Sequence, residues 1–137
     1  MGFSLHYLKD HKFMYTRISG EINDQDLKQH VIDFNKETKG ISDLRELADC
    51  RDLINLEALT VKGTSYSAIL EDNKPESLLA ILVTESPLLF GMARVYQIFA
   101  EGRRESVKIF KDINSALKWL AKDGQEIAIF NEFIKNA

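Results

Sequence analysis

Apolar and polar side chains alternate along residues 3–8 and again along residues 13–18. The polar tetrapeptide Lys9-Asp10-His11-Lys12 separates the two runs, and Gly20 follows the second. Alternation with a period of two is typical of strands, and two short strands joined by a tight polar turn predict a β-hairpin. The chain is therefore expected to open with a hairpin.

Five later segments carry apolar residues at helical spacing. Polar residues suited to capping a helix precede most of them, and Pro87 directly after Ser86 is a strong helix start. We predict helices that begin near Asn23, Asn55, Ser86 and Asp112, and a last helix over residues 125–137.

The remaining segments predict further strands and one loop. Residues 78–83 form a continuous apolar run that is typical of a central strand, and residues 106–110 alternate. Residues 41–53 can be interpreted either as a helix or as a short strand at residues 46–50. Residues 71–76 carry the Asp, Asn and Pro of a loop.

This order of elements predicts an α/β fold in one domain. Strands that alternate with helices imply parallel crossover connections, whereas the opening hairpin makes the sheet mixed. We expect a mixed, mainly parallel sheet of about five strands, packed by four to five helices.

Composition and charge exclude several classes. At 137 residues the chain fits one domain, and its 45% hydrophobic and 28% charged residues are ordinary for a globular protein. The net charge is −3 and the basic residues are dispersed, so we expect no nucleic-acid partner. The longest apolar run is too short to span a membrane, and the lone Cys50 is compatible with a reducing compartment. We expect a cytoplasmic protein that does not insert into membranes.

The residues from Leu78 to Leu120 resemble those of a known family. The apolar strand leads through Ser86-Pro87 into Gly91-Met92-Ala93-Arg94-Val95-Tyr96, and Ser106-Val107-Lys108-Ile109-Phe110 follows. This set of segments, with Leu47-Ala48-Asp49-Cys50-Arg51 before it, resembles the STAS fold, specifically the bacterial SpoIIAA-like group. The resemblance covers roughly residues 3–121. It implies a SpoIIAA-like domain over residues 1–121 and a helical extension over residues 122–137, packed on or near it.

The resemblance also implies a place for function. Anti-sigma factor antagonists of this fold carry a phosphorylatable serine between the third strand and the next helix, but residues 51–56 contain no hydroxyl here. The nearest, Thr60, is expected about one turn into the helix. Candidate partner- or ligand-binding residues in this region are Asp49, Arg51, Asn55 and Thr60.

No combination of residues indicates catalysis, and we expect no enzyme activity and no cofactor. The histidines His6, His11 and His30 are scattered and lack the convergent partners of a metal site. Cys50 lies in no cysteine-enzyme motif, and a buried strand position is the more common role for such a residue. No phosphate-binding glycine loop is present.

Two arginine positions and two apolar helices remain as candidates. Arg94 lies on an otherwise apolar helix, where it can form an ion pair, with Asp49 for example, or bind an anion. Arg103-Arg104 is expected to be a solvated turn. The helix after Ser86 carries more apolar residues than one buried stripe needs, which favours a partner, a ligand groove, or helices that cover each other.

Two hypotheses follow from these features. The first is a non-enzymatic STAS-like module that binds another protein, including a second copy of itself as a homodimer. The second is a carrier or sensor for a small apolar or amphiphilic ligand, with Arg94 or Tyr96 as the polar contact.

Overall fold

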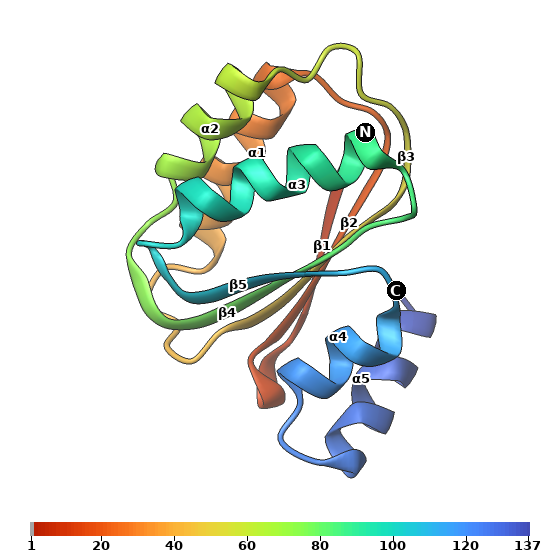
Figure 1. The fold of residues 1–137 in the computed structure, drawn as a ribbon. Helices are drawn as coiled ribbons and strands as arrows, with labels where there is room; N and C mark the ends of the chain where they lie inside the picture. Colours follow the sequence, from red (N-terminus) through yellow and green to blue (C-terminus); the bar gives the residue numbers. More distant parts are fainter. Residues whose placement is uncertain (1) are drawn as a thin grey trace.

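The computed structural model of the protein describes residues 2–137. After two opening strands, strands and helices alternate along the chain (Figure 1). The strands are β1 (Phe3–Leu8), β2 (Phe13–Glu21), β3 (Arg45–Asn55), β4 (Lys74–Leu82) and β5 (Arg104–Phe110). The helices are α1 (Asp24–Glu37), α2 (Val61–Ile69), α3 (Pro87–Ala100), α4 (Ile113–Leu120) and α5 (Gly124–Lys135), with a short 3-10 turn at Lys9–His11.

The five strands form one sheet in the order β1-β2-β3-β4-β5. β1 and β2 pair antiparallel across the hairpin, and every later pair is parallel. The α/β fold class and the mixed, mainly parallel sheet of five strands are thereby confirmed.

Helices cover both faces of the sheet. Figure 1 shows α1, α2 and α3 over one face and α4 and α5 over the other. Successive strand residues point to opposite faces, so Ala48 of β3 lies in the apolar cluster under α1–α3, whereas its neighbour Leu47 lies in the cluster under α4 and α5. This alternation decides which polar side chains can meet.

The ambiguous segment before α2 is a strand. β3 runs from Arg45 to Asn55, between β2 and β4. The helix predicted to begin near Asn55 begins instead at Val61, and that prediction was wrong. The side-chain oxygen of Asn55 accepts a hydrogen bond from the backbone nitrogen of Glu57, a turn that ends the strand. Thr60 then caps the helix by accepting a hydrogen bond from the nitrogen of Gly63.

One other boundary differs from the prediction, whereas the turn at residues 9–12 lies where it was predicted. β4 begins at Lys74, inside the predicted loop, because Lys74 pairs with Arg104 of β5 ahead of a register shift. His11 lies in the turn between the hairpin strands, which Lys12 closes with a positive φ of 51°.

The last helix packs on the sheet. Phe130 of α5 is fully buried and its ring stacks on that of Phe13, with 4.0 Å between ring centroids. The carboxylate of Glu126 accepts hydrogen bonds from Arg45 of β3, at 2.9 and 3.1 Å. The boundary at residue 121 between a domain and an extension stays a prediction.

Candidate functional site

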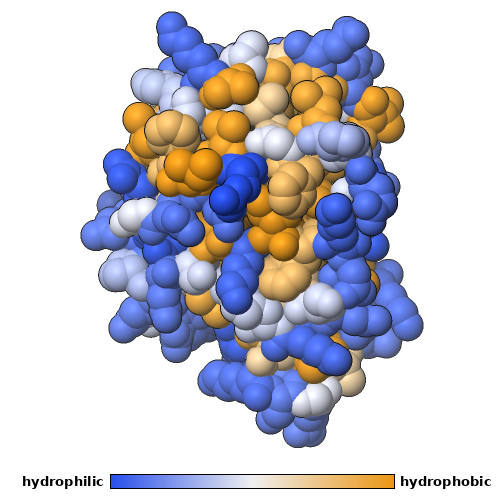
Figure 2. Space-filling model, in the orientation of Figure 1, coloured by the Kyte–Doolittle hydropathy of each residue, from blue (hydrophilic) through white to orange (hydrophobic). Residues whose placement is uncertain are grey.

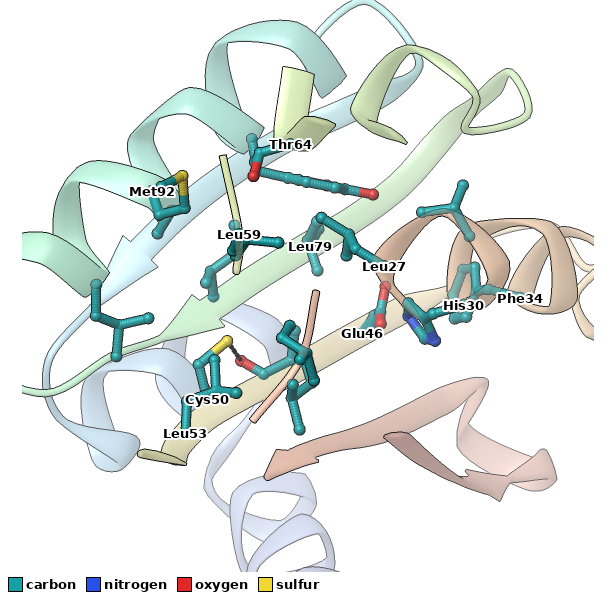
Figure 3. Close-up of a pocket in the computed structure, with 18 of the residues that line it drawn as sticks. Leu27, His30, Phe34, Glu46, Cys50, Leu53, Leu59, Thr64, Leu79 and Met92 are labelled. Carbon is teal, nitrogen blue, oxygen red and sulfur yellow. Dashed lines mark hydrogen bonds between the residues drawn. The ribbon is translucent and has the colours of Figure 1, made fainter. Parts of the chain in front are cut away.

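A cavity of about 90 Å³ lies between the sheet and the three helices α1, α2 and α3. Figure 3 shows His30 and Phe34 of α1 at one end and Cys50 and Leu53 of β3 at the other, with Thr64 on the side of α2. The wall is mainly apolar; its buried apolar residues are Ile18, Ile22, Leu27, Val31, Phe34, Ala48, Cys50, Leu59, Leu79, Ile81, Leu89 and Ala93.

The inner face of α2 carries small residues, and of the described residues of this helix only Thr64 lines the cavity. Thr64, Ser67 and Ala68 are buried, whereas the larger Tyr66 and Ile69 are 50% and 42% exposed. α2 packs against α1 and α3 and has at most weak contacts with the strands. It therefore covers the cavity without filling it.

The volume of the cavity limits its occupant. Pockets for drug-sized ligands enclose roughly 300–1,000 Å³, whereas an engineered apolar cavity of about 150 Å³ binds benzene. The cavity in this structure thus suits a very small molecule. A larger one requires α2 to move outward.

A buried ionic cluster lies beside the cavity. Arg104 of β5 donates from Nη2 to Glu46 and from Nε to Glu71, each at 2.8 Å. The second oxygen of Glu46 accepts a hydrogen bond from the hydroxyl of Thr16 at 2.7 Å, and the second oxygen of Glu71 accepts one from Tyr96. Every carboxylate oxygen of the cluster therefore has a donor, as buried charges require.

The cluster holds its members in defined protonation states. Burial by itself raises the pKa of Glu71, but the Arg104 guanidinium outweighs it and lowers that pKa below its usual value. Burial and then the Glu71 carboxylate raise the pKa of Tyr96 well above 10. Tyr96 therefore stays a hydrogen-bond donor, and Glu71 stays ionised at neutral pH.

Two polar groups line the cavity without belonging to the cluster. The Oγ1 atom of Thr64 is buried and has no hydrogen-bond partner among the described residues. The ring of His30 stacks on Phe3 at 4.2 Å, and burial lowers its pKa, so it is neutral at pH 7. These two groups are the ones available to a bound molecule.

Two of the predicted site residues of β3, Asp49 and Arg51, lie on the opposite face of the sheet. Asp49 accepts hydrogen bonds from Arg51 at 2.9 Å and from Tyr15 at 2.7 Å. Tyr15 belongs to the apolar cluster under α4 and α5. The suggested ion pair of Asp49 with Arg94 does not form, because Arg94 is on α3 over the other face; it binds Gln97 instead.

The six predicted residues therefore do not form one site. Asn55 ends β3, Thr60 caps α2, and Arg94 is exposed on α3. Tyr96 alone among the six lines the cavity. A role for the other five in binding stays a prediction.

The expectation of a solvated turn at Arg103-Arg104 was wrong for Arg104. Its side chain is fully buried, because residue 104 already belongs to β5 and points into the cluster with Glu46 and Glu71. The alternation of β5 gave no signal for this position, because it groups Arg104 with the exposed Lys108, whereas the Arg104 side chain lies on the same face of the sheet as Val107. For Thr64 and Glu46 there was no signal in the sequence either.

The other candidates for chemistry give no site. Cys50 is buried in β3, and burial raises the pKa of its thiol to about 12, so it is not a reactive thiolate. Within residues 2–137 no group of three or more His, Cys, Asp or Glu side chains is placed to hold a metal ion. None of the described helices has both the length and the apolar character needed to cross a membrane.

Comparisons with known proteins bear on the fold. No family model matches the sequence, and no curated protein matches it either. Among solved structures, an uncharacterized protein of the DUF3478 family from Shewanella loihica PV-4, described as having a SpoIIAA-like fold, superposes with a TM-score of 0.56. The match covers 87% of this chain and 92% of that protein. This chain has a SpoIIAA-like fold.

The SpoIIAA-like fold confirms the resemblance inferred from residues 3–121. The two sequences are 22% identical, so the likeness shows the fold alone. What this chain binds has to be argued from its own cavity and surface.

Proposed function

We propose that this protein is a non-enzymatic binding module that takes a small apolar or amphiphilic ligand into the cavity under α2. The observation that carries the proposal is an apolar cavity into which a buried hydroxyl without a partner, that of Thr64, projects. Well-packed cores contain few voids, and buried polar groups are almost always bonded. A single ligand would both fill the void and form a hydrogen bond with the hydroxyl.

The free energy of apolar burial, compared with the free-energy cost of association, favours a natural ligand larger than the closed cavity admits. Burial of apolar surface stabilises a complex by about 25 cal/mol per Å², so a small aromatic that buries roughly 150 Å² gains about 4 kcal/mol. Association costs of several kcal/mol offset most of this gain. Small probes should therefore bind weakly, and a tight ligand should extend further and displace α2.

Toluene is the simplest probe for this proposal; it is larger than the closed cavity admits, so its binding also requires α2 to move outward. In a chemical-shift titration we expect the amide and methyl signals of cavity residues such as Ala48 and Leu79 to move and to saturate. Replacing Ala93 with leucine fills the cavity from α3 and should abolish the response. Ile98→Leu is the matched control, because Ile98 is 56% exposed on the same helix. Equal responses in Ala93→Leu and the wild type would refute binding in the cavity.

A second candidate function, binding of a protein partner, is favoured by the outer surface of α2 and α3. Figure 2 shows apolar side chains gathered over this part of the molecule, with polar ones around them. The exposed large apolar residues of the two helices are Val61, Tyr66, Ile69, Leu88, Phe90, Ile98 and Phe99. Contiguous exposed apolar surface is typical of an interaction site.

We take a second copy of this chain as the occupant. Exposed residues of both signs lie on these helices or at their ends, with Lys62 of α2 and Arg94 of α3 basic and Glu101, the C-cap of α3, acidic. A face with both signs can be complementary to itself in a two-fold dimer. Sedimentation over a range of concentrations should show a dimer that Phe99→Gln weakens. A monomer at all concentrations would contradict this second candidate and leave the cavity proposal untouched.

A further inference from the structure

We propose that the ligand of the cavity is uncharged and is recognised by a hydrogen bond to the hydroxyl of Thr64 on α2. The inference rests on the proposed function, because it names the ligand class for the same cavity. It follows from two properties of the described residues: an unpaired hydroxyl that faces the cavity, and cavity carboxylates whose oxygens are already hydrogen-bonded.

The hydroxyl of Thr64 is placed for a ligand. Thr64 is 2% exposed, its Oγ1 has no hydrogen-bond partner within residues 2–137, and it lines the cavity. Hydroxyls on helices commonly bond to a backbone carbonyl one turn earlier, as Ser65 does with Lys62. Thr64 does not, so its capacity to donate and to accept is directed to the cavity, where Figure 3 shows it pointing inward from α2.

The charges near the cavity leave no place for a charged ligand. Both oxygens of Glu46 and of Glu71 already accept hydrogen bonds, so a cation has no free carboxylate. Arg104 donates through Nε and Nη2, and its Nη1 is buried without a partner among the described residues. Arg104 does not line the cavity, however, and its guanidinium lies 5.3 Å from the centroid of the Phe34 ring, so it offers no charge to an anion there. An ion in an apolar cavity without a counter-charge loses far more hydration energy than it recovers.

His30 does not change this conclusion. Its ring lines the cavity from α1 and is neutral at pH 7, because burial lowers its pKa. The carboxylates of Glu46, Glu71 and Asp33 oppose that shift and the guanidinium of Arg104 adds to it. A neutral imidazole provides a hydrogen bond and no charge, which again suits an uncharged molecule.

The ligand class is therefore an alcohol, phenol or ketone with an apolar body. The hydroxyl of Thr64 can donate to a carbonyl or accept from an alcohol, so it does not choose between them. The apolar body fits against side chains such as Leu79 and Leu89.

Three probes that share a phenyl ring test the inference: toluene, benzyl alcohol and benzoate. We expect the wild type to bind benzyl alcohol about 3- to 10-fold more tightly than toluene, as one hydrogen bond predicts, and not to bind benzoate in the cavity. In Thr64→Val, which keeps the branched shape, benzyl alcohol should lose this advantage and bind no more tightly than toluene, because its hydroxyl would be buried without a partner. Thr64→Ser retains the hydroxyl and should restore the preference for the alcohol.

The outcomes separate this inference from the proposed function. If toluene binds in the cavity but benzyl alcohol has no advantage, or keeps it in Thr64→Val, the inference is overturned and the proposed function stands. Benzoate bound in the cavity as tightly as benzyl alcohol overturns the uncharged class. If none of the three probes moves the signals of the cavity residues, the proposed function fails and the inference fails with it.

Discussion

The carboxylate of Asp24, in the first turn of α1, accepts hydrogen bonds from the backbone nitrogen and the hydroxyl of Thr60, at 2.8 and 2.6 Å. Thr60 is the cap of α2, so a side chain of one helix fixes the start of the next. Gly63 makes this contact possible, since a Cβ there would lie 2.1 Å from Cγ of Asp24. The position of the cover over the cavity thus depends on Asp24.

We predict that Gly63→Ala loosens α2. The added methyl group must displace the Asp24 carboxylate and break its hydrogen bonds to Thr60, which costs about 1–2 kcal/mol. The higher helix propensity of alanine recovers part of that loss. Hydrogen exchange of the α2 amides should become faster, while exchange in α4 stays the same.

Gly91→Ala is the matched control. Gly91 is exposed in α3, and a Cβ there meets nothing within 4 Å. Only the gain in propensity remains, so we expect stabilisation by about 0.5–1 kcal/mol. If Gly63→Ala stabilises the protein as much as Gly91→Ala does, Asp24 does not hold α2.

A second prediction concerns two buried serines. The hydroxyl of Ser67 is buried and has no partner in the part of the chain that the structure describes, whereas that of Ser77 donates to the carbonyl of Lys74 at 2.8 Å. Ser67→Ala removes an unpaired polar group and should leave the stability unchanged or raise it by up to about 1 kcal/mol. Ser77→Ala breaks a satisfied bond and should cost about 1–2 kcal/mol. Urea unfolding of both variants gives the comparison.

The sign of the difference is what matters in that experiment. Equal losses in Ser67→Ala and Ser77→Ala would mean that the hydroxyl of Ser67 is bonded in solution. A hydroxyl that is unpaired in the structure on the inner face of α2 would then no longer indicate a ligand, and Thr64 would need the same test.

A third prediction concerns the buried ionic cluster. Arg104→Gln leaves the carboxylates of Glu46 and Glu71 facing each other without their cation, and breaking a buried pair costs about 3–5 kcal/mol. Arg17→Gln is the control, because Arg17 and Asp52 form an exposed pair, with side chains 51% and 52% exposed. We expect a large fall in the melting temperature for Arg104→Gln and little change for Arg17→Gln. Similar small shifts in both would show that water reaches the cluster.

Most of the fold was accessible from local sequence signals. The hairpin, the caps at Asn23, Ser86 and Asp112 and the apolar run of β4 each depend on a few neighbouring residues, and the structure has all of them. The error at α2 has a local cause as well. Leu56 and Leu59 have the spacing of a helical stripe, and no sequence pattern distinguishes the turn that Asn55 forms with Glu57 from the start of a helix.

The candidate site was not accessible in the same way. Glu46, Glu71 and Arg104 meet across 58 and 33 residues of sequence, and only the register of three strands and the loop before β4 brings them together. The alternation of β3 also places Asp49 on one face of the sheet, whereas Arg94 lies over the other face. No single segment of the sequence reveals this separation. The cavity depends on what α2 lacks on its inner face, and small residues at helical spacing predict close packing as readily as a void.

The last prediction concerns acid stability and the attachment of α5. Burial alone would raise the pKa of Glu126, but hydrogen bonds from Arg45, from His11 and from the backbone of Lys122 outweigh it and lower the pKa to about 2. A carboxylate with a lowered pKa contributes stability that is fully present above its ordinary value of 4.5 and is lost as the pH falls towards 2. Glu126→Gln should therefore destabilise the protein most at neutral pH, and the difference from the wild type should shrink below about pH 4.5. Glu132→Gln, exposed on the same helix, should show no such dependence. A difference that stays constant from pH 7 to pH 3 in urea unfolding would show that the charge of Glu126 does not hold α5 in place.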